Sequence, residues 1–159
     1  MYKSFIGIDP GAKGGIAIID RNGVTAEIMP MMDKQIQIRE ICEYLEPLEK
    51  PYVVIEKVHA MPKQGVSSTF TFGRGVGELL GMLKTLQLPY FEVTPQEWKK
   101  KVMVGVNWKG NKKASITYCK KTYPLLDLLP SKRCRVPSDG MADALCMAEY
   151  GRMRILAGA

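Results

Sequence analysis

The sequence predicts an α/β fold: a five-stranded mixed sheet, with three antiparallel strands followed by two parallel ones, flanked by helices. Three short apolar stretches joined by tight turns come first, which is the pattern of an antiparallel meander. Two more apolar stretches follow, each after a segment whose apolar residues repeat at helical spacing, and this order favours parallel strands. The chain has 159 residues with no linker or internal repeat, so we expect a single domain over 1–159.

The three opening strands are predicted at 5–9, 15–19 and 24–29, and Asn22-Gly23 between the last two is a hairpin-turn signal. The rest of the chain is predicted to hold a helix over about 35–48, a strand over 52–55, a loop over 57–69, a helix over about 70–86, a strand over 89–93, and helices starting at Thr94, near Lys112 and at Asp139. Thr94, Pro95 and Glu97 give the first of these three helices a sharp start, because they form a capping box with proline at the first helical position.

The composition is that of an ordinary globular protein, with 46% apolar and 25% charged residues. No signal-peptide pattern and no apolar stretch long enough for a membrane span occurs, so we expect a cytoplasmic protein, in a bacterium or a phage-infected host. A zinc site is excluded, because there is one histidine and the cysteines form no C-x-x-C pair. We expect buried, reduced thiols at Cys42, Cys119, Cys134 and Cys146.

Positive charge is concentrated in one part of the chain. The formal net charge is +7, and residues 99–135 hold eleven Lys or Arg residues against one acid, Asp127. Any single basic run could be a solvated face, but a segment this unbalanced repels itself unless a polyanion is nearby. The pattern favours a nucleic-acid phosphate backbone as partner.

Four carboxylates stand where they cost stability. Asp9 and Glu56 each end an apolar strand, and a carboxylate there is costly without a cation or strong donors. Asp139 and Asp143 lie four residues apart, so they share one helix face as like-charged neighbours. Together the four offer hard oxygen ligands, which Mg²⁺ and Mn²⁺ prefer.

Each of these acids also has an ordinary structural explanation. Asp9 could cap the Pro10-Gly11 turn, Glu56 could pair with Lys57, and Asp139 could stabilise a helix N-terminus. The conjunction of two strand ends with a helical pair favours a metal site over four separate accidents.

Three segments carry a family resemblance: Ile-Gly-Ile-Asp-Pro-Gly at 6–11, Val-Ile-Glu-Lys-Val at 54–58 and Met-Ala-Asp-Ala-Leu at 141–145. In this order they resemble the catalytic blocks of RuvC-type Holliday junction resolvases, of the RNase H-like superfamily, over about residues 5–150. Residues 56–74 are similar to the phage-encoded branch of that family.

The resemblance implies a function and a mechanism. Asp9, Glu56, Asp143 and a further acid would hold two Mg²⁺ ions, for which Mn²⁺ could substitute. The enzyme would resolve four-way DNA junctions by paired symmetric nicks, leaving 5′-phosphates through two-metal-ion hydrolysis. The sequence departs from the bacterial family in the last block, where the position three before Asp143 is Gly140, so Asp139 is expected to supply the fourth carboxylate.

The resemblance also suggests DNA contacts. His59 stands where the bacterial family has a stacking aromatic, although a plain surface histidine is the alternative. Of Phe70 and Phe72 we expect one in the core and one, Phe72, near DNA. The basic residues expected to contact the phosphate backbone are Arg74, Lys100, Lys109, Lys112 and Lys113. Trp108 is expected in an exposed loop, either stacking on bases or packed.

A homodimer is implied as well, because a four-way junction has two-fold symmetry and needs two symmetric nicks. The candidate interface is the helix predicted at 70–86, whose small residues would allow close approach: Gly73, Gly75, Gly77 and Gly81.

Several alternatives stay open. The same superfamily includes two-domain kinases and ATPases, but this chain is too short for both of their domains. A nuclease for Y-junctions, flaps or RNA–DNA hybrids would use the same acids, since substrate choice depends on shape readout. A non-catalytic junction-binding protein is the remaining alternative, and the presence of all four acids argues against it.

Overall fold

The computed structural model describes residues 1–24, 26–31, 37–59 and 65–158 and confirms the predicted α/β architecture. Five strands and five helices follow one another in the described part of the chain: β1 (Ser4–Asp9), β2 (Gly15–Asp20), β3 (Ala26–Pro30), α1 (Ile38–Leu45), β4 (Pro51–Glu56), α2 (Val66–Thr85), β5 (Tyr90–Val93), α3 (Pro95–Val102), α4 (Ala114–Thr122) and α5 (Asp139–Leu156). No described helix is long and apolar enough to cross a membrane.

The sheet has the strand order β3-β2-β1-β4-β5. β1 pairs antiparallel with β2, and β2 with β3, whereas β4 runs parallel to both β1 and β5. The prediction of three antiparallel and two parallel strands is therefore confirmed. Since β1 and β4 are parallel neighbours, their last residues lie at the same edge of the sheet.

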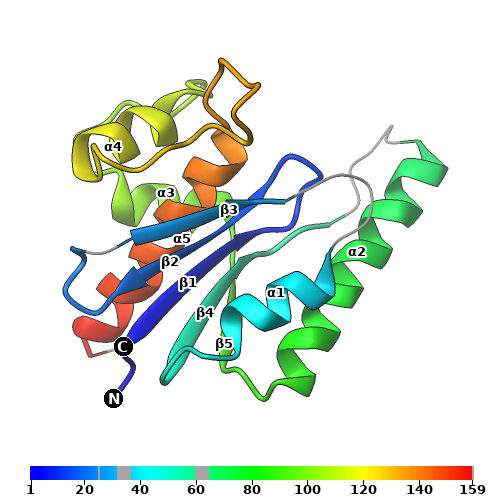
Figure 1. Cartoon of the computed structure of the whole chain (residues 1–159). Coiled ribbons are helices and arrows are strands. Elements are labelled where there is room, and N and C mark those ends of the chain that lie inside the picture. The colour runs from blue at the N-terminus through cyan, green and yellow to red at the C-terminus, as the bar shows by residue number, and fades with distance from the viewer. Residues whose placement is uncertain (25, 32–36, 60–64, 159) are drawn as a thin grey trace.

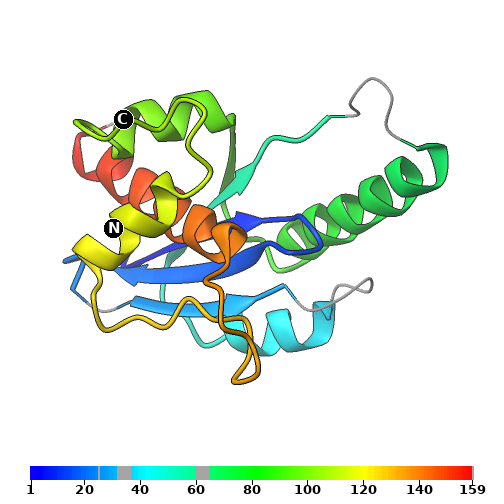
Figure 2. The ribbon, with the colours of Figure 1, turned by 90° about the horizontal axis from the view of Figure 1, so that it is seen from above.

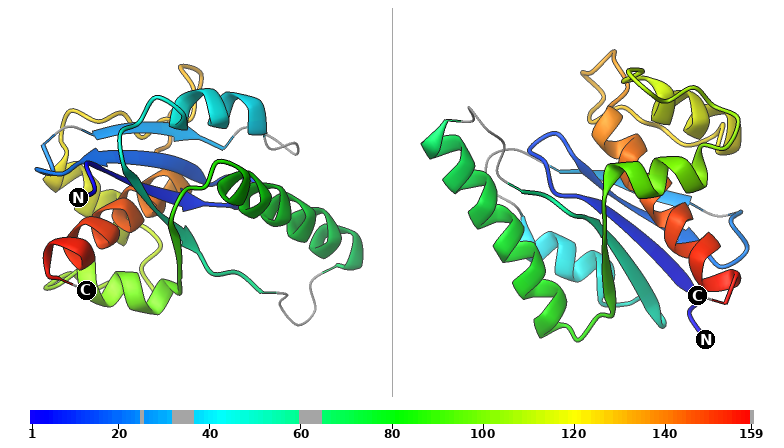
Figure 3. Two further views of the ribbon diagram at one scale, coloured as in Figure 1. Left: turned by 90° about the horizontal axis from the view of Figure 1, so that it is seen from below. Right: turned by 180° about the vertical axis from the view of Figure 1, so that it is seen from behind.

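Helices cover both faces of the sheet (Figures 1 and 3). α1 and α2 pack on one face, and α5, backed by α3 and α4, packs on the other. Side chains along β1 alternate between the two layers: Ile6 and Ile8 join the core beneath α1 and α2. The intervening Gly7 lies under α5.

Helix α5 crosses β1 so closely that their backbones are in contact at Gly7. A Cβ placed on Gly7 would lie 1.8 Å from the Ala144 carbonyl oxygen and 2.5 Å from the Ala148 nitrogen. Only glycine fits there, so the sequence Ile6-Gly7-Ile8 fixes how deeply α5 sits on the sheet. This close crossing brings the first turns of α5 next to the end of β1.

Several predicted helix limits were wrong. The helix predicted over 35–48 is Ile38–Leu45 in the described residues, with 32–36 outside them. The loop predicted over 57–69 ends earlier, because α2 begins at Val66. The helix predicted to start at Asp139 does start there, and it runs to Leu156.

The expectation that one of Phe70 and Phe72 lies in the core was also wrong. Phe70 is 72% exposed and Phe72 is half-buried outside both core clusters. The buried residues of α2 are Leu79, Met82 and Leu83, all in its C-terminal half. Figure 2 shows the reason: the first half of α2 extends beyond the sheet, where no described helix or strand packs over it.

The thiols follow the prediction in part. All four cysteines are free, but only Cys119 and Cys146 are buried, whereas Cys42 and Cys134 are half-buried.

Candidate active site

The sheet places Asp9 and Glu56 side by side. Ile8 pairs with Ile55 in the parallel β1–β4 ladder, and the two acids are the next residues of their strands. Ile8 and Ile55 face the α1–α2 layer, so alternation turns the following residue of each strand towards α5. Both carboxylates are half-buried there.

The N-terminal turns of α5 supply the other two acids. Ser138 caps the helix by accepting a hydrogen bond from the Met141 N–H at 3.2 Å, so α5 starts at Asp139. Asp143 is half-buried one turn later, and Asp139 is exposed. In Figure 1 the start of α5 lies at the same end of the molecule as the ends of β1 and β4.

Gly140 explains why the chain departs from the bacterial acid spacing. A Cβ on Gly140 would lie 2.2 Å from the Lys13 carbonyl oxygen and 2.6 Å from the Gly14 Cα. The start of α5 packs against the β1–β2 turn at this point, and no side chain fits between them. The position three before Asp143 therefore excludes a carboxylate, whereas the neighbouring Asp139 has an exposed side chain.

Asp9, Glu56 and Asp143 have raised pKa values. Burial raises the pKa of Asp9 to about 7; the Gly11 N–H opposes this shift, and the charges of Glu56, Asp143 and Asp139 add to it. Burial also raises the pKa of Glu56 and of Asp143, with Asp143 adding to the shift at Glu56 and Asp139 to that at Asp143. The carboxylate cluster is therefore short of positive charge.

Three neighbouring groups oppose these shifts. The Ser115 hydroxyl donates a hydrogen bond to Asp143 Oδ1 and lowers its pKa. The indole of Trp98 lowers the pKa of Glu56, although its buried Nε1 has no acceptor at full hydrogen-bond geometry among the described residues. Lys99 lowers the pKa of both Glu56 and Asp143 by its charge.

The donor chemistry fits a hard divalent cation, because the cluster offers carboxylate oxygens only. Among the described residues, however, no three acidic, histidine or cysteine side chains stand close enough together to enclose a metal ion. Three of the four carboxylates accept hydrogen bonds from protein donors. Asp9 Oδ1 accepts from the Gly11 N–H at 2.9 Å, Asp139 Oδ1 from the Gly140 N–H at 3.0 Å, and Asp143 Oδ1 from Ser115.

Lys99 was missed by the sequence analysis, which named Lys100. Pro95, Trp98, Lys99 and Val102 share one face of α3, at i, i+3, i+4 and i+7. Trp98 and Val102 on that face are buried, which marks it as the inner one. This helix phase could have identified Lys99, whereas Lys100 is exposed.

The other expected DNA contacts lie on the surface. His59 is exposed beyond the end of β4, and Phe72 and Arg74 lie on the projecting half of α2. Arg74 forms an exposed ion pair with Glu78 at 3.7 Å. Three exposed lysines precede or open α4: Lys109, Lys112 and Lys113.

Trp108 is packed. It is half-buried and lies against the core cluster beneath α5, so the packing alternative is favoured over an exposed stacking contact.

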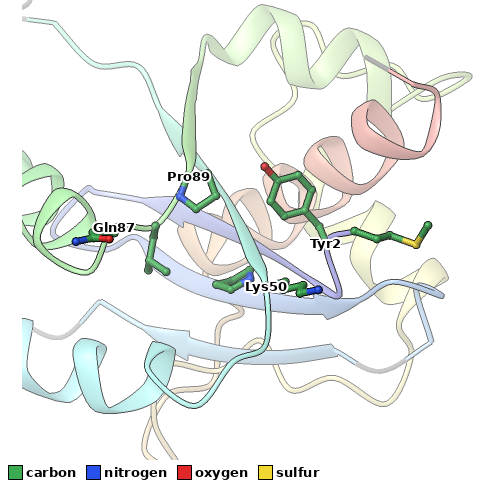
Figure 4. A pocket seen from close by; sticks show the side chains of 7 residues that line it. Tyr2, Lys50, Gln87 and Pro89 are labelled. Atoms are coloured by element: carbon green, nitrogen blue, oxygen red, sulfur yellow. The ribbon is translucent and has the colours of Figure 1, made fainter.

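A pocket of about 510 Å³ lies at the opposite end of the sheet, at the starts of β1 and β4 (Figure 4). Tyr2, Lys50, Gln87 and Pro89 line it, together with apolar groups and no acid. It is unconnected with the carboxylate cluster, because β1 and β4 separate the two.

Solved structures with the same architecture exist. RuvC of T. thermophilus in complex with a Holliday junction substrate superposes with a TM-score of 0.66 at 15% identity, covering 98% of this chain and 96% of that one. This chain has the RuvC fold. A second Thermus thermophilus RuvC structure gives 0.63 at 16% identity, covering 96% of each chain. The yeast mitochondrial Holliday junction resolvase Ydc2 gives 0.62 at 15% identity, covering 99% of this chain and 81% of that one.

Neither a protein-family model nor a curated relative matches the sequence. The likeness to RuvC is therefore one of fold, and the resemblance in the three acidic segments is consistent with it.

Proposed function

We propose that this protein is a structure-selective DNA endonuclease that resolves Holliday junctions. It cuts two symmetric strands by divalent-metal-dependent hydrolysis and leaves 5′-phosphates. The catalytic groups are Asp9, Glu56, Asp139 and Asp143, which also serve as ligands for two Mg²⁺ ions, with Mn²⁺ able to substitute.

The observation that carries the proposal is that three separate elements place four carboxylates at the same end of the molecule. These elements are β1, β4 and α5. Burial and repulsion between the carboxylates raise the pKa of Asp9, Glu56 and Asp143. Such an arrangement is costly for folding and has no structural benefit of its own. Perturbed carboxylates gathered in one place are a mark of functional sites.

The charge distribution supports a nucleic-acid substrate. The basic segment 99–135 comprises the second half of α3, all of α4 and the loops around them, which lie on the α5 side of the molecule (Figures 1 and 3). We assign the phosphate backbone to Arg74, Lys100, Lys109, Lys112 and Lys113, and base or junction contacts to His59 and Phe72. The fold that this chain shares with a RuvC bound to a Holliday junction makes a branched duplex the best candidate.

The residues divide the chemical work. Asp9, Glu56, Asp139 and Asp143 would hold the cations, whose contribution when bound is Lewis acidity at the scissile phosphate. Lys99 sits beside Glu56 and Asp143, where its ammonium group can attract the DNA phosphate towards the carboxylates. The Lys99 ammonium nitrogen lies 5.1 Å from the centre of the ring of Trp98, which is fully buried.

Resolution by paired nicks requires two active sites, and we propose a homodimer formed through α2. A Cβ at Gly73, Gly77 or Gly81 would meet no described atom within 4 Å, so this helix face is open along its length. Val66 and Phe70 near its start are 88% and 72% exposed. An isologous contact along this helix would cover both features.

The test is cleavage of end-labelled four-way, Y-shaped, flap, linear and RNA–DNA hybrid substrates with Mg²⁺, with wild type beside Asp143→Asn. Paired symmetric nicks in the four-way junction, lost in the variant, are expected. If Y-junctions, flaps or hybrids are cut equally well, the protein is a nuclease of broader substrate range and not a dedicated resolvase. Junction binding without cleavage in either Mg²⁺ or Mn²⁺ would leave a binding protein.

A further inference from the structure

We propose that Ser115 is a positioning residue for Asp143: its hydroxyl holds one carboxylate oxygen so that the other is presented to a divalent cation. The inference rests on the proposed function, since it assigns Asp143 to the cation site. It adds a residue from α4 to a site otherwise built from β1, β4 and α5.

Ser115 is buried without a structural need for a hydroxyl. It is 3% exposed, and within the described residues Ser115 and Glu149 are the two buried polar or charged side chains. Glu149 is accounted for by Arg152, which bonds both of its oxygens at 2.8 and 2.7 Å. Ser115 donates to Asp143 Oδ1. A hydroxyl taken out of water is costly unless it is bonded, so the residue is explained by Asp143.

The packing of α4 on α5 fixes where this hydroxyl lies. The buried residues of α4 are all small: Ala114, Ser115 and Cys119. One turn beyond Ser115, the Cys119 thiol donates to the Ala142 carbonyl at 3.5 Å and lies 3.8 Å from the Cys146 sulfur. Because these contacts flank Asp143 on α5, they hold the Ser115 hydroxyl in register with it.

A neutral donor suits this position better than a cation would. A lysine or arginine bonded to Asp143 would compete with a metal ion for the same carboxylate by charge repulsion. A hydroxyl donates to one carboxylate oxygen and so orients the group. Because the hydroxyl is neutral, the carboxylate keeps its full negative charge to attract the metal ion. Partners of this kind orient metal-bound carboxylates and tune their affinity.

The test measures binding of Mn²⁺ alone to the DNA-free protein by isothermal titration calorimetry. Ser115→Ala is expected to weaken Mn²⁺ binding by about tenfold or more, within the range found for such partners. Turnover on a four-way junction falls by a similar factor at fixed Mg²⁺, while the Kd for the junction in EDTA is unchanged. Ser115→Thr, which keeps the hydroxyl, restores Mn²⁺ binding.

Two matched variants on α4 separate positioning from loss of packing. Ile116→Ala trims a half-buried side chain that packs on the same core, and Thr117→Ala removes a hydroxyl from an exposed position. Both are expected to keep wild-type Mn²⁺ affinity, even where Ile116→Ala lowers Tm as much as Ser115→Ala does. If the extra methyl group of Ser115→Thr prevents folding, the comparison of Ser115→Ala with Ile116→Ala decides.

The outcomes distinguish this inference from the proposed function. Equal Mn²⁺ affinity in wild type and Ser115→Ala, with junctions still cut, overturns the role of Ser115 alone. A wild-type protein that cuts no branched DNA but binds Mn²⁺ in a Ser115-dependent way overturns the proposed function and supports the positioning role. Absence of Mn²⁺ binding in the wild type overturns both.

Discussion

Asp9 is held where its protonated form is favoured. Burial and three neighbouring carboxylates raise its pKa from 3.8 to about 7. The folded protein therefore favours the protonated over the ionised form by on the order of 4 kcal/mol more than water does. A protein without a use for this charge would gain stability by losing it. At the scale of single residues, Asp9 is therefore the clearest sign that the site is kept for a purpose other than folding.

This pKa gives a prediction for the metal-free protein. Since the folded pKa is above the unfolded value, the folded state binds more protons between about pH 4 and pH 7, and stability falls as pH rises through that window. Asp9→Asn, which keeps an acceptor for the Gly11 N–H, should be more stable than wild type by about 2–4 kcal/mol near pH 8. Urea unfolding in EDTA across this pH range measures the difference.

At about pH 3 the two proteins should converge, because Asp9 is then protonated in the folded state and largely so in the unfolded state. A difference that is independent of pH would show that the gain comes from something other than the charge. Metal binding should have the opposite slope, with affinity rising up to about pH 7, because carboxylate ligands must first be deprotonated.

Gly140 gives a prediction of the opposite sign. Gly140→Ala forces a Cβ against the Lys13 carbonyl and the Gly14 backbone, so it should destabilise the protein by about 3 kcal/mol or more. Thermal unfolding measures this, with Thr117→Ala as control, because this residue is exposed on a helix and alanine favours the helix. A Gly140→Ala protein as stable as wild type would contradict the close packing of α5 on the β1–β2 turn.

The sequence predicted those site residues whose signal is local. Asp9 and Glu56 follow apolar strands, and Asp139 and Asp143 share a helix face. Carboxylates at such positions cost stability, so the sequence alone identifies them as candidate site residues. Ser115 carries no such signal, because its importance depends on α4 lying against α5. The role of Gly140 was equally hidden, since it comes from contact with Lys13 and Gly14, far away in sequence.

At the scale of elements, the orientation of α3 decides which lysine serves the site. Lys99 shares the inner face with Trp98 and Val102, whereas Lys100 points to solvent. Lys99→Ala should lower kcat on a junction by about tenfold to a thousandfold, the size expected for one electrostatic contact near a reacting phosphate. Lys100→Ala should act mainly on the salt dependence of DNA binding.

Single-turnover cleavage and a salt titration of binding, run on both variants, check this assignment. Equal kcat losses for the two lysines would mean that the helix phase has no bearing on catalysis.

The element α2 carries the prediction on assembly. Gly77→Arg adds a large charged side chain where the isolated subunit has open space, so folding should be unaffected. If α2 joins two subunits, the dimer should weaken by at least about tenfold, as buried interfacial charge is costly. Sedimentation velocity measures the strength of the dimer. The delay between the first and the second nick in one junction measures whether the two active sites still act together. A dimer of unchanged strength would place the interface elsewhere.

Helix limits were the least predictable feature of the elements. The α2 start at Val66 was missed because Gly65, Ser67 and Ser68 look like a loop, yet the helix projects from the sheet where no packing pattern is imposed. Conversely, the Thr94–Glu97 capping box fixed the start of α3 from sequence alone, since both of its hydrogen bonds are local.

At the scale of the whole molecule, one architecture places both the four acids and the residues that surround them. The parallel pairing of β1 and β4 puts two acids at one edge of the sheet, and α5 adds two more from above. α3 and α4 pack behind α5 and carry lysines and Ser115 around the same end. The order of strands and helices was predictable because hydrophobic patterns are local, whereas the stacking of α3 and α4 on α5 was not.

The most direct test of the account is resolution of a four-way junction in Mg²⁺, followed by treatment of the products with DNA ligase. Wild type should give paired duplex products that ligase reseals, as symmetric nicks with 5′-phosphates require, and Asp9→Asn, Glu56→Gln and Asp143→Asn should bind the junction without cutting it. Cleavage that survives these three substitutions, or a wild type that binds the junction and cuts it with neither Mg²⁺ nor Mn²⁺, would contradict the account.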